Sequence, residues 1–282
     1  MNNILKWFPE NDLYTKTKEL EIHALLHDKN SKDERNAEQI LAGKRKIRAE
    51  ALEKALTTFN RKINGKVLEI GAGDGWCSAY LAKNKIFEEL YVMECNLPAV
   101  EQLIPKTFEI LSAPTDRINL VHGSFNYINK DINFNVIVAM GALHHAKNLF
   151  HTFKECYEAL RPGGFLIAQE PYMLDSTKNE FYFEREKKEI EFWGVKTLKN
   201  SERSDVFYRE CEYRTAAYHV GFDFNCIYLD ESQQIKKSLF QKLLGRNNEI
   251  KEFPTDRPRN MIFLLSKPKG NSNVRPVTSW EQ

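Results

Sequence analysis

The residues best suited to hold a nucleotide lie in segment 67–75, which reads Val-Leu-Glu-Ile-Gly-Ala-Gly-Asp-Gly. The apolar residues predict a buried strand that carries Glu69 near its end, and a helix is expected from about residue 76 to residue 83. Gly71, Gly73 and Gly75 have no Cβ, so the backbone can turn tightly and lie against a ligand. Such a turn, followed by a helix N-terminus, is typical of the nucleotide pocket of an open α/β sheet.

Two nucleotides compete for this pocket. A dinucleotide turn reads G-x-G-x-x-G, and its third glycine lets the helix pack closely on the strand. Here Trp76 takes that third position, and Glu69 would place a carboxylate beside the pyrophosphate. A ligand with a cationic amino group suits Glu69 better, and S-adenosylmethionine carries such a group. A glycine-rich turn without any ligand is the third interpretation.

Polar residues follow the next two predicted strands. Glu94 ends the apolar segment 90–95, about twenty residues after the glycines, where an acidic side chain can accept ribose hydroxyls. The alternative is a solvated glutamate at a strand end. Ser124 and Phe125 follow the predicted strand 118–123, where they would offer adenine a polar contact and an apolar face.

Strands and helices continue to alternate along the chain. The further predicted elements are a central parallel strand over 135–140, a helix over 149–160 that stops at 161–164, a strand over 165–168, a helix over 206–220, and strands over 222–229 and 261–265.

The chain resembles the class I S-adenosylmethionine-dependent methyltransferases over roughly residues 60–172. The resemblance rests on segment 69–75, on Glu94, on Gly-Ala-Leu-His-His at 141–145 and on Leu-Arg-Pro-Gly-Gly-Phe at 160–165. It implies an α/β fold, with a Rossmann-like, seven-stranded, mostly parallel sheet, an antiparallel last strand, helices on both faces and an N-terminal helical lid.

The resemblance also implies S-adenosylmethionine as cofactor and S-adenosylhomocysteine as product. By similarity, Glu69 and the glycines hold the methionine part, and Glu94 holds the ribose. Ser124 and Phe125 flank adenine, although this family often has an acidic residue in place of Ser124. The cofactor-binding residues expected in this way are Glu69, Gly71, Ala72, Gly73, Gly75, Glu94, Cys95, Ser124, Phe125 and Met140.

The chain divides into an expected helical lid over residues 1–59 and a methyltransferase core over 60–282. Segment 34–59 has apolar residues at helical spacing, from Ile40 and Ile47 to Phe59. In the lid, Trp7, Phe8 and Tyr14 would line the acceptor pocket or simply pack on the core. Insertions at about 171–205 and 231–259 are candidates for acceptor recognition. Helix 232–244 is expected to be an ordinary packed helix, and the alternatives are a contact with a membrane surface or a lipid-linked acceptor, or a dimer contact.

The histidine pair after the fourth strand suggests the chemistry. Methyl transfer from a sulfonium is an in-line displacement, so the enzyme mainly aligns donor and acceptor, and a base helps when the acceptor is a hydroxyl. His145 is the first candidate for that base and His144 the second, although either would also suit a role in shaping the loop or contacting the cofactor. Glu170 and Tyr172, after the fifth strand, are further candidates. Adjacent histidines lack the spacing of a dedicated metal site, so no metal is expected.

Composition narrows the acceptor and the location. The formal net charge of +2 gives no nucleic-acid signature, so a small molecule or glycan is the expected acceptor, most simply a sugar hydroxyl or a similar oxygen or nitrogen nucleophile. The five cysteines are scattered, and we see no basic leader or membrane-length apolar run. These features predict a cytoplasmic protein. The rival classes are an NAD-dependent oxidoreductase and a non-catalytic cofactor-binding subunit of the same fold.

Overall fold

The computed structural model describes residues 4–8, 37–182, 184, 207–229 and 258–270. Their centre is a sheet that has eight strands within these described residues. In spatial order the strands are β1 (Ile4–Trp7), β4 (Ile118–Gly123), β3 (Glu89–Glu94), β2 (Lys66–Ile70), β5 (Phe134–Met140), β6 (Leu160–Tyr172), β8 (Arg259–Ser266) and β7 (Asp223–Tyr228). The pairs from β1 to β6 are parallel, whereas β8 runs antiparallel to both β6 and β7.

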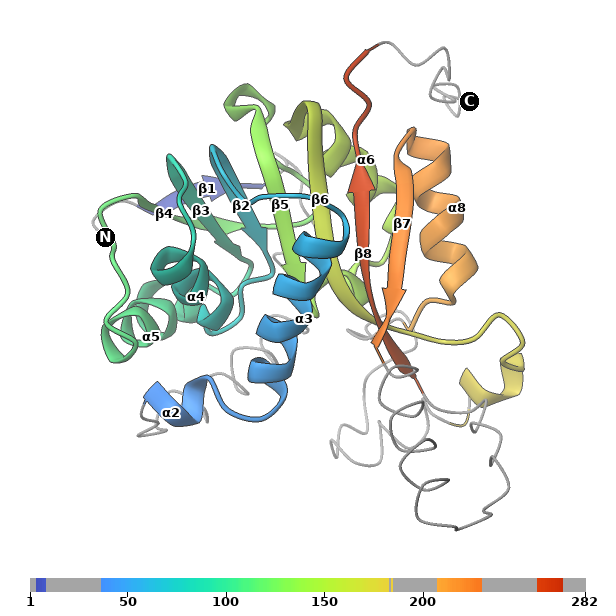
Figure 1. Ribbon diagram of the computed structural model, residues 1–282, viewed down its shortest axis with the longest axis horizontal. Coiled ribbons are helices and arrows are strands. Elements are labelled where there is room, and N and C mark those ends of the chain that lie inside the picture. Colours follow the sequence, from blue (N-terminus) through green and yellow to red (C-terminus); the bar gives the residue numbers. More distant parts are fainter. Residues whose placement is uncertain (1–3, 9–36, 183, 185–206, 230–257, 271–282) are drawn as a thin grey trace.

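Helices cover both faces of the sheet (Figure 1). Those packed on one face are α3 (Lys44–Thr58), α4 (Trp76–Asn84) and α5 (Ile104–Ile110). The short helix α2 (Ala37–Ile40) comes before α3, and the π-helical turn η2 (Ala99–Leu103) comes directly before α5. Those packed on the other face are α6 (Leu149–Ala159) and α8 (Glu210–Val220). Two short 3-10 turns, η3 (Lys130–Ile132) and η4 (Leu143–His145), lie in the connections. The predicted Rossmann-like, mostly parallel α/β fold with an antiparallel last strand is confirmed.

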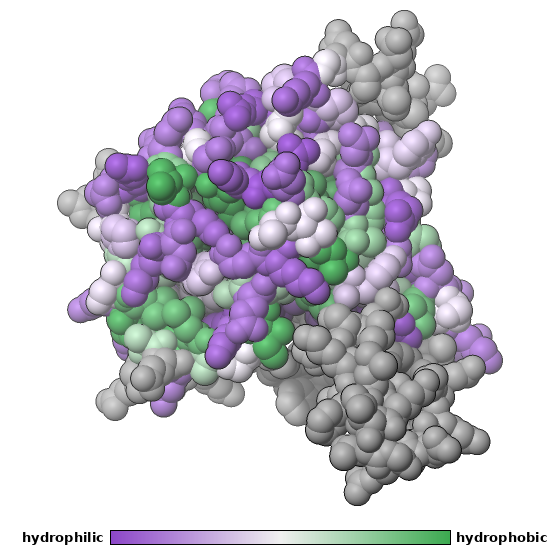
Figure 2. Space-filling model, viewed as in Figure 1, coloured by the Kyte–Doolittle hydropathy of each residue, from purple (hydrophilic) through white to green (hydrophobic). Residues whose placement is uncertain are grey.

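The sheet separates two hydrophobic cores. Strand β5 is apolar at nearly every position and is buried on both faces, as a central parallel strand requires. On the α3 side the core includes Leu52 and Val138, and on the other side it includes Phe153 and Tyr213, all fully buried. Each such large apolar side chain contributes about 1.5–3 kcal/mol on burial. The outer surface on the α3 side is mostly hydrophilic (Figure 2).

The first strand corrects the predicted strand count and the predicted lid. Residues Ile4–Trp7 add an eighth, parallel strand beside β4, within the segment expected to form only a helical lid. Trp7 is buried, and its ring stacks on Tyr91 at 5.7 Å and lies 6.2 Å from Phe134. Trp7 therefore packs the core and does not line an acceptor pocket. The ring of Phe8 meets the ring of His122, and Tyr14 lies outside the described residues.

The predicted helix over 34–59 is interrupted at Gly43. This glycine has a φ of 57°, a left-handed value that separates α2 from α3. Ala51 and Leu56 pack inward as predicted, but Ile47 is 50% exposed. Figure 1 shows that the first turns of α3 extend past the edge of the sheet.

Several predicted boundaries also shift. Strand β6 already begins at Leu160, because Leu160 pairs with Phe134 across an irregular register before regular pairing resumes at Val136. Helix α8 begins at Glu210, four residues later than predicted. The predicted helix 232–244 and most of both insertions lie outside the described residues. Among the helices that are described, none has the length and apolar character needed to cross a membrane.

Candidate active site

A cavity of about 170 Å³ opens at the carboxyl edge of the parallel strands, where ligands bind in open α/β sheets. It brings together seven of the residues singled out from the sequence: Gly71, Gly73, Glu94, Cys95, Ser124, Phe125 and His145. Its other lining residues were not predicted, and they are Gly123, Asn126, Gly141, Ala142, Ala146 and Lys147. The segments after β2, β3, β4 and β5 thus meet around one space.

The glycine turn, residues 71–75, forms the floor of this cavity. Gly71 has a φ of 65°, and a Cβ on it would lie 2.6 Å from the Cβ of Ala142. Only glycine therefore allows the turn after β2 to approach the segment after β5 this closely. At Gly73 a Cβ would meet nothing within 4 Å, which leaves open space on the cavity side.

Glu94 fixes the glycine turn from the end of β3. Its Oε2 accepts a hydrogen bond from the backbone N–H of Gly73 at 2.9 Å. Its Oε1 accepts from the backbone N–H of Asn96 at 3.0 Å and from Sγ of Cys95 at 3.2 Å. An ionised carboxylate has about four acceptor positions, so three donors still leave capacity for a ligand hydroxyl. Glu94 is nearly buried and borders the cavity.

Glu69 lies beneath the turn and does not line the cavity. It is 2% exposed, and its carboxyl group accepts a hydrogen bond from the hydroxyl of Ser78 in α4. Burial raises the pKa of Glu69 from 4.5 to about 8. Trp76, at the start of α4, is itself buried in the core of the α3 side. This arrangement favours a supporting role for Glu69 under the turn over direct contact with the cofactor.

Helix α3 is attached to the glycine turn and to the end of β5 by two arginines that were not predicted from the sequence. Arg45 forms an ion pair with Asp74 of the glycine turn, and Arg48 donates to the carbonyl oxygen of Met140 at 3.2 Å. The two side chains are three residues apart and so lie on one face of the helix. The spacing of the two arginines can be seen in the sequence, but it does not show which residues this face of the helix contacts.

The segment after β5 forms a histidine turn, residues 142–146. Here Glu170, fully buried on β6, accepts from the backbone N–H groups of Ala142 and Leu143, both at 2.8 Å. Its other oxygen faces Nδ1 of His144 at 2.8 Å. Only His145 of the pair lines the cavity. Tyr172 is 2% exposed and packs against Tyr228, away from the cavity lining. Glu170 thus positions the turn, and its burial disfavours direct contact with an acceptor.

Strand β1 also reaches the site. The backbone N–H of Ser124 donates to the carbonyl oxygen of Trp7 at 3.2 Å, and Oγ of Ser124 accepts from the N–H of Asn126 at 3.2 Å. These bonds hold Phe125 beside Gly71, where its ring would lie 3.2 Å from a Cβ on that glycine. Ala72 and Gly75 belong to the glycine turn but do not line the cavity, and neither does Met140 at the end of β5.

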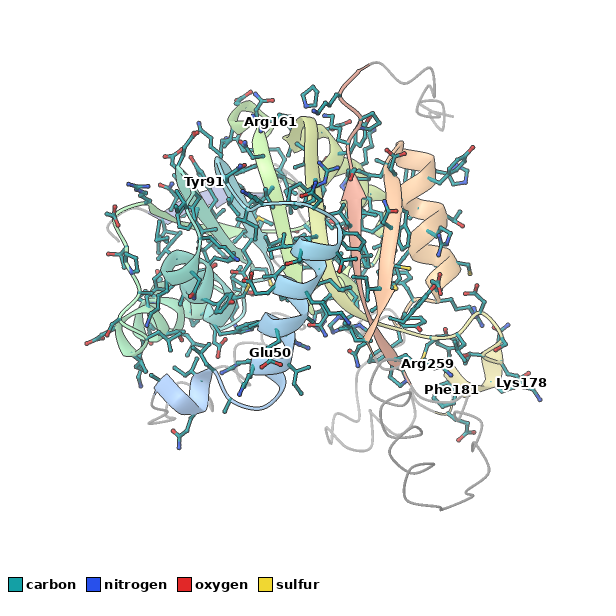
Figure 3. The ribbon with its side chains drawn as sticks, viewed as in Figure 1. Glu50, Tyr91, Arg161, Lys178, Phe181 and Arg259 are labelled. Carbon is teal, nitrogen blue, oxygen red and sulfur yellow. The ribbon has the colours of Figure 1, made fainter. Side chains whose placement is uncertain are left out.

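The described residues contain no group of three or more His, Cys, Asp or Glu side chains arranged to hold a metal ion. Figure 3 labels Arg259 at the lower end of β8, where it pairs with Tyr172 at the end of β6, close to the start of the first insertion. That insertion therefore leaves the sheet at the same lower edge to which β5 and β6 run (Figure 1).

The sheet order and the glycine turn define an open α/β fold with a nucleotide-type pocket at the carboxyl edge of its strands. Residues 41–226 match the model of a family described as a methyltransferase domain, and the chain belongs to that family. The predicted class, a class I S-adenosylmethionine-dependent methyltransferase, is therefore confirmed, and S-adenosylmethionine is the cofactor of that class. No curated protein matches the chain.

Solved structures share the fold at low sequence identity. Phosphoethanolamine N-methyltransferase 2 of Haemonchus contortus, in complex with S-adenosylmethionine, is 16% identical, with a TM-score of 0.56 over 93% of this chain and 61% of that one. A candidate methyltransferase from Bacillus halodurans is 14% identical, with a TM-score of 0.54 over 78% and 99%. A candidate sarcosine dimethylglycine methyltransferase from Galdieria sulphuraria is 14% identical, with a TM-score of 0.53 over 79% and 86%.

Proposed function

We propose that S-adenosylmethionine binds in the cavity at the carboxyl edge of the sheet. The glycine turn would hold its methionine part, Glu94 its ribose hydroxyls, and Ser124 with Phe125 its adenine. The observation that carries this proposal is the position of Glu94, which borders the cavity while three donors hold its carboxylate. Glu69 would support the turn from beneath.

The protein then transfers the methyl group to a small-molecule or glycan acceptor, most simply a sugar hydroxyl or a similar oxygen or nitrogen nucleophile. The acceptor's lone pair attacks the methyl carbon, the bond from carbon to sulfur breaks, and S-adenosylhomocysteine leaves with the electron pair on sulfur. The protein's own contribution is alignment of the two reactants and exclusion of water. The Haemonchus and Galdieria proteins are named for methylation of phosphoethanolamine and of sarcosine or dimethylglycine, which supports including nitrogen acceptors among the candidates.

The polar groups on the cavity wall favour such an acceptor. Asn126 and Lys147, which are not assigned to the cofactor, also line the cavity. Their polar side chains suit a hydroxylated or charged small molecule. The formal net charge of +2 disfavours a nucleic-acid acceptor. We also propose a cytoplasmic location. A peripheral contact of segment 232–244 with a membrane surface is the alternative that we keep for that segment.

An acceptor screen tests this function. Wild-type protein is incubated with S-adenosylmethionine and panels of sugars, sugar nucleotides, phenols and amines, and release of S-adenosylhomocysteine is measured. The proposal expects turnover with a hydroxylated small molecule or glycan. Methylation of apolar phenols alone would contradict the acceptor class. Binding of S-adenosylhomocysteine without turnover on any panel would favour the non-catalytic subunit, and oxidation of a substrate with NAD would favour the oxidoreductase, which buried Trp76 disfavours.

A further inference from the structure

The carboxylate of Glu170 is completely buried and is surrounded by hydrogen-bond donors. Oε1 accepts from the N–H groups of Ala142 and Leu143, both at 2.8 Å. Oε2 accepts from the N–H of His144 at 3.3 Å and lies 2.8 Å from Nδ1 of its ring. Backbone donors on both oxygens favour the ionised form of a carboxyl group. The histidine turn is therefore organised around a buried negative charge.

This charge determines which nitrogen of His144 carries hydrogen. An ionised carboxylate is only an acceptor, so Nδ1 of His144 must be the donor in the 2.8 Å contact. In the neutral ring the other nitrogen, Nε2, then has the free lone pair. A carboxylate that holds a histidine in this tautomer prepares the ring to accept a proton at Nε2.

The ring of His144 lies between the cavity and the end of the first insertion. Its centroid is 4.1 Å from that of His145, which lines the cavity, and 5.9 Å from that of Phe207, on which it stacks. The next residue, Tyr208, donates its hydroxyl hydrogen to the carbonyl oxygen of Ala146 in the histidine turn. The side chain of His144 is 13% exposed, whereas that of Glu170 behind it is completely buried.

We propose that His144, held by Glu170, is the group that takes the proton from the acceptor, and that His145 contacts the cofactor. This inference rests on the proposed function and names its proton acceptor. As the acceptor oxygen bonds to the methyl carbon, its O–H hydrogen passes to Nε2 of His144, and the carbon–sulfur electron pair stays on sulfur. Glu170 is a positioning residue, because it is completely buried and its carboxylate bonds to His144 and to backbone N–H groups of the histidine turn.

The tautomer is measured on the full chain without any acceptor. Long-range ¹H–¹⁵N NMR of histidine-labelled protein, at a pH where imidazoles are neutral, should show His144 with hydrogen on Nδ1. The variant H144Q identifies its signals. In Glu170→Gln the side-chain NH₂ would face the ring and impose hydrogen on Nε2 instead. A wild-type His144 with hydrogen on Nε2 would overturn the proposal, and this test does not require that the Glu170 variant folds.

Kinetics separate the two histidines. With a hydroxyl acceptor from the screen, H144Q should lower kcat by roughly 100- to 10,000-fold with little change in the KM for S-adenosylmethionine. H145Q should mainly raise that KM. H219Q, at an exposed histidine of α8, is the matched control and should change neither. Loss of kcat in H145Q but not in H144Q would refute the assignment. Absence of S-adenosylhomocysteine binding by wild type would instead refute the proposed function. The tautomer of His144 could still be measured by NMR in that case.

Discussion

The backbone N–H of Gly73 donates to Oε2 of Glu94 over 2.9 Å, and this bond ties the turn after β2 to the end of β3. The two residues are 21 positions apart in the sequence. Both border the cavity. The same carboxylate thus shapes the glycine turn and faces the space proposed for the ribose.

Glu94→Gln should weaken S-adenosylhomocysteine binding by roughly 10- to 100-fold, because hydrogen bonds to a charged group contribute about 1.5–3 kcal/mol. Isothermal titration calorimetry measures the change in Kd. Glu89→Gln is the matched control, since Glu89 lies at the other end of β3 with a side chain 40% exposed. Equal affinities for the two variants would remove Glu94 from the cofactor site.

Gly71→Ala should reduce S-adenosylhomocysteine binding at least tenfold, because the new methyl group would collide with Ala142 on the cavity wall. The left-handed backbone alone costs about 1–2 kcal/mol for a non-glycine residue. Gly43→Ala has the same kind of strain, with a φ of 57° and nothing within 4 Å of its Cβ. Gly43→Ala should therefore lower the Tm but keep the affinity. If both variants bind S-adenosylhomocysteine as wild type does, the glycine turn is not the binding floor.

Glu69 should make stability depend on pH. Burial raises its pKa from 4.5 to about 8, so the folded protein holds this proton more tightly than the unfolded chain. The resulting stabilisation is complete below about pH 4.5 and is lost as the pH rises through about 8. The Tm of wild type, compared with that of Glu69→Gln at each pH, should therefore fall between about pH 5 and about pH 8.5. Parallel curves for the two proteins would show that Glu69 titrates normally.

The ion pair between Arg45 and Asp74 should couple α3 to the glycine turn. Side-chain exposures of 25% and 9% leave this pair less screened than a surface pair. A double-mutant cycle with Arg45→Met and Asp74→Asn, measured by urea unfolding, should give a coupling energy of about 1–3 kcal/mol. Lys66 and Glu89, 3.6 Å apart and both about 40% exposed, provide the comparison. Their coupling energy should stay below about 0.5 kcal/mol. Similar coupling energies for the two pairs would show that the pair of Arg45 and Asp74 does not couple α3 to the glycine turn.

The cofactor side of the site was predictable because its signals are local. The glycines and Glu94 directly follow apolar strands, and parallel strands bring their carboxyl ends to one edge. Arg45 and Arg48 were missed because a helix sequence does not say which distant loop its face will contact. Glu170 looked like a candidate base, and nothing local could show that it serves backbone N–H groups some 27 residues away.

The N-terminal strand was missed for a different physical reason. Four residues, Ile4–Trp7, carry too little alternation to indicate a strand, and their pairing depends on the free edge of β4. The break at Gly43 was likewise hidden, because apolar spacing continues across it. At the strand the tertiary environment decided the local structure, whereas the break at Gly43 follows from the freedom of glycine to adopt a left-handed φ.

We propose that the cavity between the glycine turn and Glu94 holds S-adenosylmethionine. The most direct measurement is calorimetric titration of wild-type protein with S-adenosylhomocysteine and, separately, with NAD. We predict one-to-one binding of S-adenosylhomocysteine, weakened in Gly71→Ala and Glu94→Gln, and no binding of NAD. At about one hundred times its Kd the ligand should also stabilise the fold by roughly 2.7 kcal/mol. Binding of NAD without S-adenosylhomocysteine would contradict the claim, as would S-adenosylhomocysteine binding that neither variant weakens.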